Sequence, residues 1–119
     1  MGSSGSLIRV KDQDGVKRIE FTERNILDEA NIQQIGEEIG RIVDSQERPR
    51  VLINFHNVDH LSSAALGTLI TINNKIRGKE GQLRLAEIDP QIYEVFVITK
   101  LNKLFQIFES AEQAMASFS

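Results

Sequence analysis

The stretch Val51-Leu-Ile-Asn-Phe-His-Asn-Val-Asp-His-Leu-Ser-Ser-Ala-Ala-Leu-Gly-Thr-Leu-Ile70 decides the fold of this chain. Residues 51–55 form a short apolar run of the kind that suits a strand covered on both faces. A polar turn, residues 56–60, interrupts this run, and the apolar residues after Leu61 have helical spacing. Strand, tight connection and helix therefore follow one another, with two serines at the joint. The first backbone N–H groups of such a helix have no partners within it and can hold an anion.

The length and composition limit the number of domains and the class of protein only broadly. A chain of 119 residues is long enough for one domain with a proper core and too short for two. Its 40% hydrophobic and 26% charged residues are typical of soluble globular proteins. A net charge of -3, with no run of Lys or Arg, argues against a nucleic-acid partner. The absence of Cys excludes disulfides, Cys-based zinc sites and a thiol nucleophile, and fits a reducing, cytoplasmic location.

No apolar run approaches the ~18–20 residues that a membrane span needs, and no secretory segment is recognisable at the start. We therefore expect no membrane partner. Residues 1–6, Met-Gly-Ser-Ser-Gly-Ser, are typical of an expression tag, and we expect residues 7–119 to form a single domain.

The N-terminal part predicts a hairpin followed by a helix. Residues 7–21 alternate between apolar and polar on either side of Asp14-Gly15, a good turn dipeptide. Asp28 is a candidate N-cap for the helix behind it. Gly36 and Gly40 make one side of that helix smooth, which indicates close packing on a sheet. The residues of this helix predicted to be buried are Ile32, Ile35, Ile39, Ile42 and Val43.

The C-terminal part predicts two further strands and two further helices. A turn at residues 78–81 precedes a strand at 82–88, and Asp89-Pro90 then begins a helix in the favoured arrangement. The inward side chains predicted for that helix are Ile92, Val95, Phe96 and Thr99. Residues 104–108 form a last strand, and the capping-box spacing of Ser110-Ala-Glu-Gln113 begins a closing helix.

Strands that alternate with helices after an initial hairpin predict an α/β fold. We expect a mixed, largely parallel central sheet of about five strands, packed by about four helices. The apolar strand at 51–55 is expected at its centre. Ligands and partners of such sheets gather at the carboxyl ends of the strands, which points to the loop at 56–62.

Six short segments, in this order and spacing, resemble a STAS domain, and most closely the bacterial anti-sigma factor antagonists. They are Leu27-Asp28, the 51–70 stretch, Glu80-Gly-Gln-Leu-Arg-Leu85, residues 90–96, Thr99-Lys-Leu101 and Ser110-Ala-Glu-Gln-Ala-Met115. The resemblance runs from Leu7 to Phe118 and implies a STAS-like fold.

The family signature reads roughly apolar-Asp-Ser-Ser/Thr-Gly-Leu-Gly, and its first hydroxyl after Asp is phosphorylated. The resemblance places Ser62 at the Asp and Ser63 at the phosphorylated position. It places Ala64 at the second hydroxyl and Ala65 at the Gly, while Gly67 matches directly.

The resemblance implies a switch in partner binding. In this family the unmodified antagonist captures an anti-sigma factor, usually a serine kinase of the GHKL type, and so frees a sigma factor. The kinase then phosphorylates the antagonist, and a metal-dependent serine phosphatase resets it. Carried over to this chain, the phosphorylated residue is Ser63. The expected partner-binding residues are Asp28, Asp59, His60, Ser62, Ser63, Ala64 and Gly67. No cofactor or metal is implied, and we expect a monomer or weak dimer.

Structural roles stand beside these functional ones. Ser63 is equally interpretable as the N-cap of its helix, and Ser62 as the cap or a local turn bond. Asp28 either lies near the phosphorylated serine, as the matching acid of the family does, or only caps its own helix. His56 and His60 are best interpreted as solvated loop side chains, since no third metal ligand is clustered with them.

The sequence also lacks the motifs of common enzymes. Gly-x-Ser-x-Gly does not occur around Ser63, and no P-loop or dinucleotide fingerprint is present. We therefore expect a non-enzymatic protein. Two rivals to the antagonist remain: a STAS subunit with a constitutive structural role, as in a lipid-transporting ABC assembly or an anion transporter, and a small-molecule or nucleotide sensor. The antagonist hypothesis requires Ser63 to be reachable from solvent at the first turn of its helix.

Overall fold

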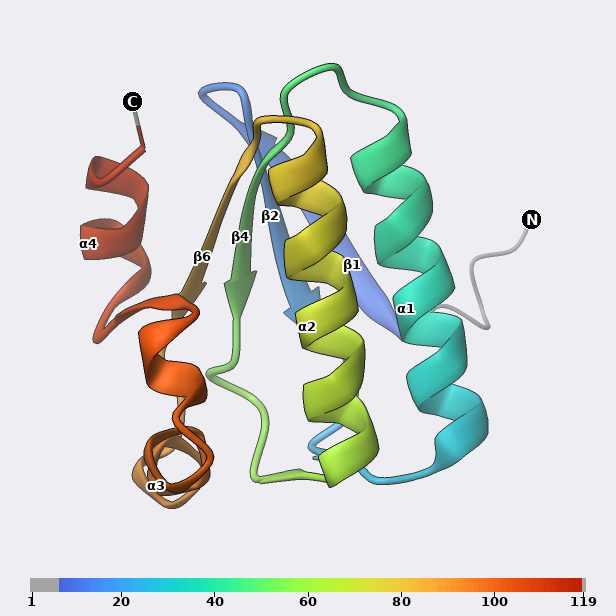
Figure 1. Ribbon diagram of the computed structural model, residues 1–119, viewed down its shortest axis with the longest axis vertical. Helices are drawn as coiled ribbons and strands as arrows, with labels where there is room; N and C mark the ends of the chain where they lie inside the picture. The colour runs from blue at the N-terminus through green and yellow to red at the C-terminus, as the bar shows by residue number, and fades with distance from the viewer. Residues whose placement is uncertain (1–6, 119) are drawn as a thin grey trace.

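The computed structural model describes residues 7–118, so the expected tag lies outside the described residues. A five-stranded sheet with the order β1-β2-β4-β6-β7 forms its centre (Figure 1). Strand β1 is antiparallel to β2, and the other neighbours are parallel. The strands are β1 Ile8–Gln13, β2 Val16–Phe21, β4 Arg50–Asn54, β6 Gln82–Ala86 and β7 Gln106–Phe108. Two short parallel strands, β3 Asn25–Ile26 and β5 His60–Leu61, form a separate pair.

Helices lie on both faces and at one end of this sheet. Helices α1, Glu29–Asp44, and α2, Ser63–Gly78, run side by side over one face, and α4, Ala111–Ala116, packs on β4, β6 and β7 from the other (Figure 1). Helix α3, Pro90–Ile98, lies at the end of the sheet where α1 and α2 begin (Figure 1). A 3₁₀ turn, Leu101–Lys103, follows it. The predicted α/β architecture, a largely parallel sheet with an N-terminal hairpin and four helices, is confirmed.

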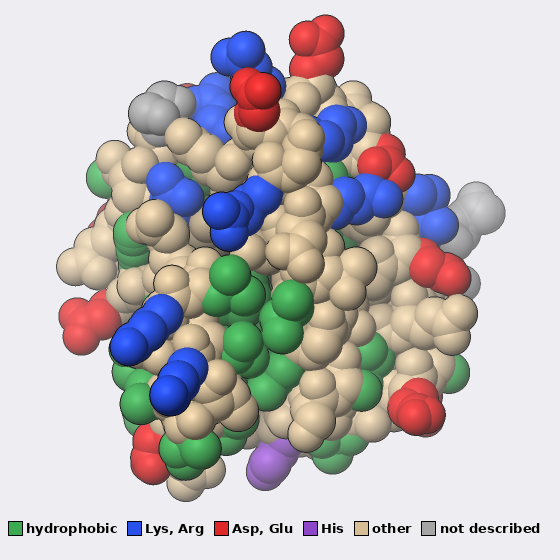
Figure 2. All heavy atoms as spheres, viewed as in Figure 1, with side chains coloured by type: hydrophobic (Ala, Val, Ile, Leu, Met, Phe, Trp, Pro, Cys, Tyr) green, Lys and Arg blue, Asp and Glu red, His purple; other side chains and the backbone are tan. Residues whose placement is uncertain are grey.

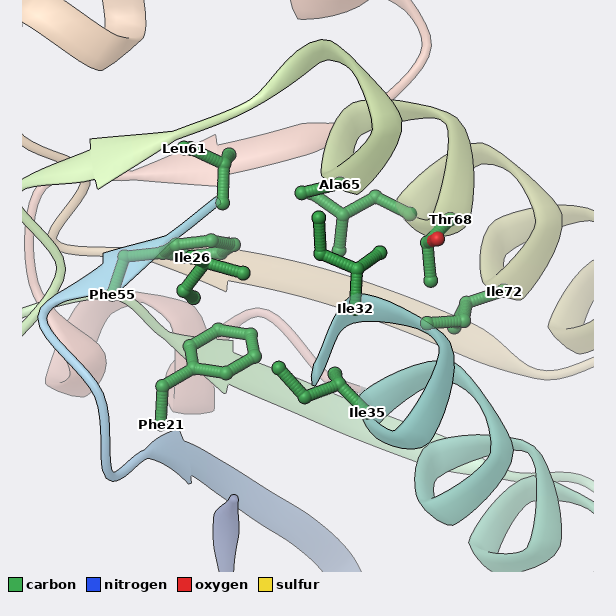
Figure 3. A pocket seen from close by; sticks show the side chains of 10 residues that line it. Phe21, Ile26, Ile32, Ile35, Phe55, Leu61, Ala65, Thr68 and Ile72 are labelled. Atoms are coloured by element: carbon green, nitrogen blue, oxygen red, sulfur yellow. The ribbon is translucent and has the colours of Figure 1, made fainter. Parts of the chain in front are cut away.

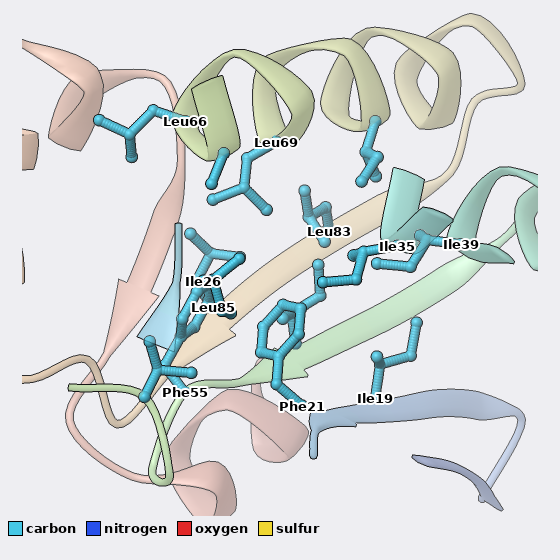
Figure 4. Packing of buried hydrophobic residues seen from close by; sticks show 14 of the residues in the cluster. Ile19, Phe21, Ile26, Ile35, Ile39, Phe55, Leu66, Leu69, Leu83 and Leu85 are labelled. Atoms are coloured by element: carbon cyan, nitrogen blue, oxygen red, sulfur yellow. The ribbon is translucent and has the colours of Figure 1, made fainter. Parts of the chain in front are cut away.

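Strand β4 is buried on both faces, as its apolar run predicts. Val51 and Ile53 belong to the large core under α1 and α2, whereas Leu52 belongs to the smaller core under α4. All three side chains are fully buried because successive side chains of a strand point to opposite faces. Figure 4 shows how neighbouring strands complete the large core. Ile19 and Phe21 of β2 and Leu83 and Leu85 of β6 point toward Ile35, Ile39 and Leu69 of the two helices.

The N-terminal hairpin has the predicted turn. Asp14 and Gly15 adopt φ angles of 53° and 81°, so both central residues of the two-residue loop are left-handed. This backbone matches the right-handed twist of the strands that it joins. The register pairs Gln13 with Val16, which places the turn where Asp-Gly predicts it.

Two strand boundaries of the C-terminal part differ from the sequence prediction. Strand β6 ends at Ala86 rather than at residue 88, because Glu87 turns the chain with a left-handed φ of 58°. The Glu87 carboxylate accepts a hydrogen bond from the Ala111 N–H at 3.1 Å, so this turn also holds the start of α4. Strand β7 begins at Gln106 rather than at residue 104, since the 3₁₀ turn occupies the preceding residues.

The inward stripe of α3 is narrower than predicted. Ile92 and Phe96 are buried, but Val95 and Thr99 are exposed. Residues four apart share one stripe of a helix, so Val95 and Thr99 lie exposed on the same flank. In α1, Ile42 is likewise only half-buried, whereas the other four predicted core residues are buried.

The smooth side of α1 packs on α2 and not on the sheet, contrary to the prediction. A Cβ added at Gly36 would lie 3.0 Å from Thr68 Cγ2, and one at Gly40 would lie 3.9 Å from Lys75 Nζ. At the far end of the pair, Lys79 Nζ donates to the carbonyl oxygens of Val43 and Asp44, both at 3.1 Å. Close packing and this cap fix α1 and α2 to each other. Within residues 7–118, no helix combines the length and apolar character needed to cross a membrane.

Gly81 provides a test of the packing where the α2–β6 turn meets the entry to β4. An added Cβ would overlap the Pro49 carbonyl oxygen and would lie 2.9 Å from Ile76 Cγ2. We expect Gly81→Ala to lower the free energy of unfolding by about 2 kcal/mol, the usual cost of overpacking a rigid site.

Gly78→Ala is the matched control, because a Cβ at Gly78 meets nothing within 4 Å in the last turn of α2. We expect it to be neutral or to stabilise by about 0.5–1 kcal/mol. Urea unfolding of the two variants measures both values, and equal effects would contradict the packing described for Gly81.

Candidate functional site

The joint between β4 and α2 is held in place by the β3–β5 pair. Asn25 pairs with His60 and Ile26 with Leu61, so the segment before α1 runs parallel to the segment before α2. The ladder continues one residue further, because the Ser62 N–H donates to the Ile26 carbonyl oxygen at 3.1 Å. The first turns of the two helices are therefore positioned together at the carboxyl end of the sheet.

The loop that leads to this joint is anchored by backbone hydrogen bonds and one ion pair. The N–H groups of Asp59 and His60 both donate to the Arg24 carbonyl oxygen, at 2.7 and 3.2 Å. Arg24 Nε in turn donates to the Asp59 carboxylate at 2.8 Å. Asp59 is half-buried and already engaged by a cation of its own chain. Its expected role in partner binding stays a prediction.

The two histidines of the loop are exposed, as expected. His60 Nδ1 lies 2.8 Å from the Asn25 side-chain oxygen, and His56 Nδ1 lies 3.0 Å from that of Asn54. Between them, Val58 is buried and pins the loop to the core. Among residues 7–118, no group of three His, Cys, Asp or Glu side chains is arranged to hold a metal ion.

The two serines of the joint have different roles. Ser62 is the N-cap of α2: its backbone is extended, and its Oγ accepts a hydrogen bond from the Ala65 N–H at 3.3 Å. The interpretation of Ser63 as the cap is therefore wrong, and that of Ser62 as the cap is confirmed. Ser63 is the first residue of the helix, and its side chain is exposed, as the antagonist hypothesis requires.

Asp28 caps α1 in the same way, with its Oδ1 accepting from the Asn31 N–H at 3.1 Å. It follows Ile26 by two residues, as Ser63 follows Leu61. Because Ile26 and Leu61 are paired, the β3–β5 register brings the starts of the two helices together. The capping role of Asp28 is confirmed, and its role toward Ser63 stays a prediction.

The first turn of α2 presents small residues outward. Ala64 and Gly67 are exposed, and a Cβ added at Gly67 would meet nothing within 4 Å. Gly67 is therefore not required for packing within this chain. Ala65 points inward and is buried. The outer side of the first turn consequently has only small side chains around the Ser63 hydroxyl.

Beneath this turn the core is nearly closed. A cavity of about 10 Å³ lies between α1, α2 and the ends of β2 and β4, with only apolar lining surface (Figure 3). It has room for about one water molecule and no polar group to hold it. Ala65 and Thr68 of α2 line it from one side, and Ile32 and Ile35 of α1 from another. The apolar side chains that line this cavity pack beneath the first turn of α2. The cavity itself is too small to be a ligand site.

Two features beside the joint are not indicated by the sequence pattern. Leu27, directly before the α1 cap, is 53% exposed. A groove of about 160 Å³ separates the joint from α3, and its α3 side includes Gln91 and Val95. For the groove a signal existed in the sequence, since residues 90–98 contain more apolar residues than one buried face of a helix can use.

The different roles of the two serines predict different effects on stability. Ser62→Ala removes the side-chain acceptor for the Ala65 N–H, and we expect a loss of about 1 kcal/mol in the free energy of unfolding. Ser63→Ala removes an exposed hydroxyl and should change it by less than about 0.5 kcal/mol. Chemical denaturation of both variants measures the difference, and a larger loss for Ser63→Ala would contradict this assignment of the cap.

This chain is similar to known proteins in both sequence and fold. Residues 8–114 match the STAS domain family. The chain is similar to BtrV of Bordetella bronchiseptica, provisionally named an anti-sigma factor antagonist, with 33% identity over 95 residues, 80% of this chain and 81% of BtrV. Among solved structures, an anti-sigma-factor antagonist (STAS) domain protein from Planctomyces limnophilus matches with a TM-score of 0.84 and 21% identity, covering 92% of this chain and 96% of that one.

The fold also matches that of the Bacillus cell fate determinant SpoIIAA in its phosphorylated form, with a TM-score of 0.69 and 16% identity. This match covers 92% of the present chain and 96% of SpoIIAA. At such identity the likeness concerns the fold, whereas the family match extends over most of the sequence. The chain belongs to the STAS domain family.

Proposed function

We propose that this protein is an anti-sigma factor antagonist. In this proposal the unmodified protein binds an anti-sigma factor that is a serine kinase of the GHKL type. Phosphorylation of Ser63 releases the partner, and a metal-dependent serine phosphatase restores the hydroxyl. The observation that carries the proposal is the position of Ser63, an exposed hydroxyl on the first residue of a well-anchored helix, beside a second serine already used as the cap.

The separation of roles between the two serines favours Ser63 as the modified residue. Ser62 Oγ is half-buried and accepts from the Ala65 N–H, so its modification would disrupt the start of α2. Ser63 can receive a phosphate without loss of the cap. Ser62 also stands where the family signature has Asp, and both residue types accept N–H bonds as caps. The substitution therefore keeps the cap and removes a negative charge next to Ser63.

The protein itself can tolerate a phosphate at this position. A phosphoserine carries about 1.5–2 negative charges at pH 7. The N-terminus of α2 has the positive end of the helix dipole, and its first turn contains no acidic residue. The nearby Asp59 carboxylate is paired with Arg24. We therefore expect phosphorylation to leave the fold unchanged.

The same phosphate would be costly in an interface built around a neutral hydroxyl. Burial of an anion without new partners costs several kcal/mol, and repulsion from acidic or phosphate groups of a kinase adds to this cost. A loss of about 3 kcal/mol corresponds to roughly two decades of affinity. Such a loss releases a docked protein without a conformational change. Two relatives support this proposal: BtrV by its name, and SpoIIAA because it exists in a phosphorylated form.

Intact-mass measurement tests the modification. The protein is incubated with ATP and, one at a time, the GHKL-type serine kinases of its source genome. We expect one kinase to add a single phosphate to wild type and to Ser62→Ala, but none to Ser63→Ala, because Ser63 is the exposed one of the two serines at the joint. Phosphate on Ser63→Ala would contradict the assignment. An unchanged mass of wild type with every kinase would instead favour a constitutive structural subunit.

Binding measurements with Ser63 variants test whether the negative charge of the phosphate is what releases the kinase. We expect Ser63→Asp to bind that kinase at least about tenfold more weakly than wild type, because it places an anion in the interface. Ser63→Asn has nearly the same size without the charge and should bind within about threefold of wild type. Titration calorimetry measures both affinities. Equal affinities for the Asp and Asn variants would exclude charge as the signal.

A further inference from the structure

We infer that the outer face of α3 forms the second half of the partner-binding surface. In this inference, which rests on the proposed function, the anti-sigma factor that covers Ser63 also places apolar side chains against α3. The outer face is defined here by Val95 and Ile98, two exposed apolar side chains that lie three residues apart and so share one side of the helix.

Helix α3 has most of the large exposed apolar side chains of the described residues. Six large hydrophobic side chains within residues 7–118 are well exposed, and four of them belong to α3. Their exposed fractions rise from 40% for Tyr93 to 76% for Ile98. The helix uses only Ile92 and Phe96 to attach itself to the core. In Figure 2, hydrophobic side chains lie on the side of α2 that faces α3, next to the groove between them.

The outer face is continuous with the surface around Ser63. The groove of about 160 Å³ is lined on one side by Asp59, His60 and Leu66, and on the other by Gln91 and Val95. His60 immediately precedes the strand residue that leads to the two serines, and Leu66 lies one turn after Ser63. A protein that docks on the Ser63 hydroxyl therefore lies next to the groove, at the end of the sheet where α3 lies (Figure 1).

The surface around Ser63 is incomplete as an interface on its own. A stable complex buries about 800 Å² on each partner and depends on a few well-packed apolar or aromatic anchors. The seven residues predicted to bind the partner include no large exposed apolar side chain. The outer face of α3 provides such anchors on one side, and Leu27, 53% exposed, provides another beside Asp28.

The occupant that fits best is a protein other than a second copy of this chain. Helix α3 has nine residues, so it is only about 14 Å long, and a pair of such helices alone cannot bury the area that a stable dimer needs. A membrane surface is also disfavoured. The face is flanked by Glu94 and by the Asp89 cap as well as by Lys100, whereas helices that bind anionic bilayers have a basic polar side.

The test compares two valines of equal exposure. Val95 and Val10 are both 41% exposed, but Val10 lies on the edge strand β1, away from the groove. The probe is the kinase that phosphorylates wild-type protein at Ser63. We expect Val95→Glu to weaken its binding at least about tenfold, since a charge replaces an apolar anchor. Val10→Glu should bind within about threefold of wild type. Ile98→Glu, at a position 76% exposed, should also weaken binding and serves if Val95→Glu does not fold.

The possible outcomes distinguish this inference from the proposed function. If wild type binds the kinase and both α3 variants bind equally well, the inference is overturned and the proposed function stands. If no kinase binds or modifies wild type, both fail. Sedimentation that shows wild-type dimers but monomeric α3 variants would assign the face to a second copy. Binding to phosphatidylglycerol vesicles that the α3 variants lose would assign it to a membrane. Either of these results overturns the inference.

Discussion

The hydrogen bonds between β3 and β5 are the constraint on which the candidate site depends. This pair is only two residues long on each side, yet it connects the segment before α1 to the segment before α2. Its extension through Ser62 N–H to the Ile26 carbonyl fixes where α2 begins. The core below the first turn has almost no free volume, so the turn cannot sink inward. The exposed position of Ser63 follows from these two restraints together.

The sequence predicts most of the fold because its signals are local or strongly periodic. The apolar run of β4, the Asp-Gly turn and the caps at Asp28, Asp89 and Ser110 depend on a few neighbouring residues, and all are present in the structure. The choice between Ser62 and Ser63 as the cap could not be made in this way. Both are good caps, and pattern does not fix a helix boundary to a single residue.

Other features depend on tertiary contacts that the pattern does not contain. Glycines four apart indicate close packing, but only the folded chain shows that Thr68 of α2 lies against Gly36. Helix α3 has apolar residues on more than one side, so its periodicity could not separate the buried Ile92 and Phe96 from the exposed Val95. The β3–β5 pair is too short to give any alternating signal. The β3–β5 pair and the exposed side chains of α3 lie at the candidate site, where few side chains are committed to the core.

The clamping of α1 to α2 has a mechanical consequence. The two helices are tied by the β3–β5 pair at their beginnings, by glycine contacts along their length and by Lys79 at their ends. We therefore expect the two helices to move as one unit. A chemical change at one end of this helix pair is not transmitted to distant parts of the molecule. Only a partner that contacts that end of the pair can detect the change.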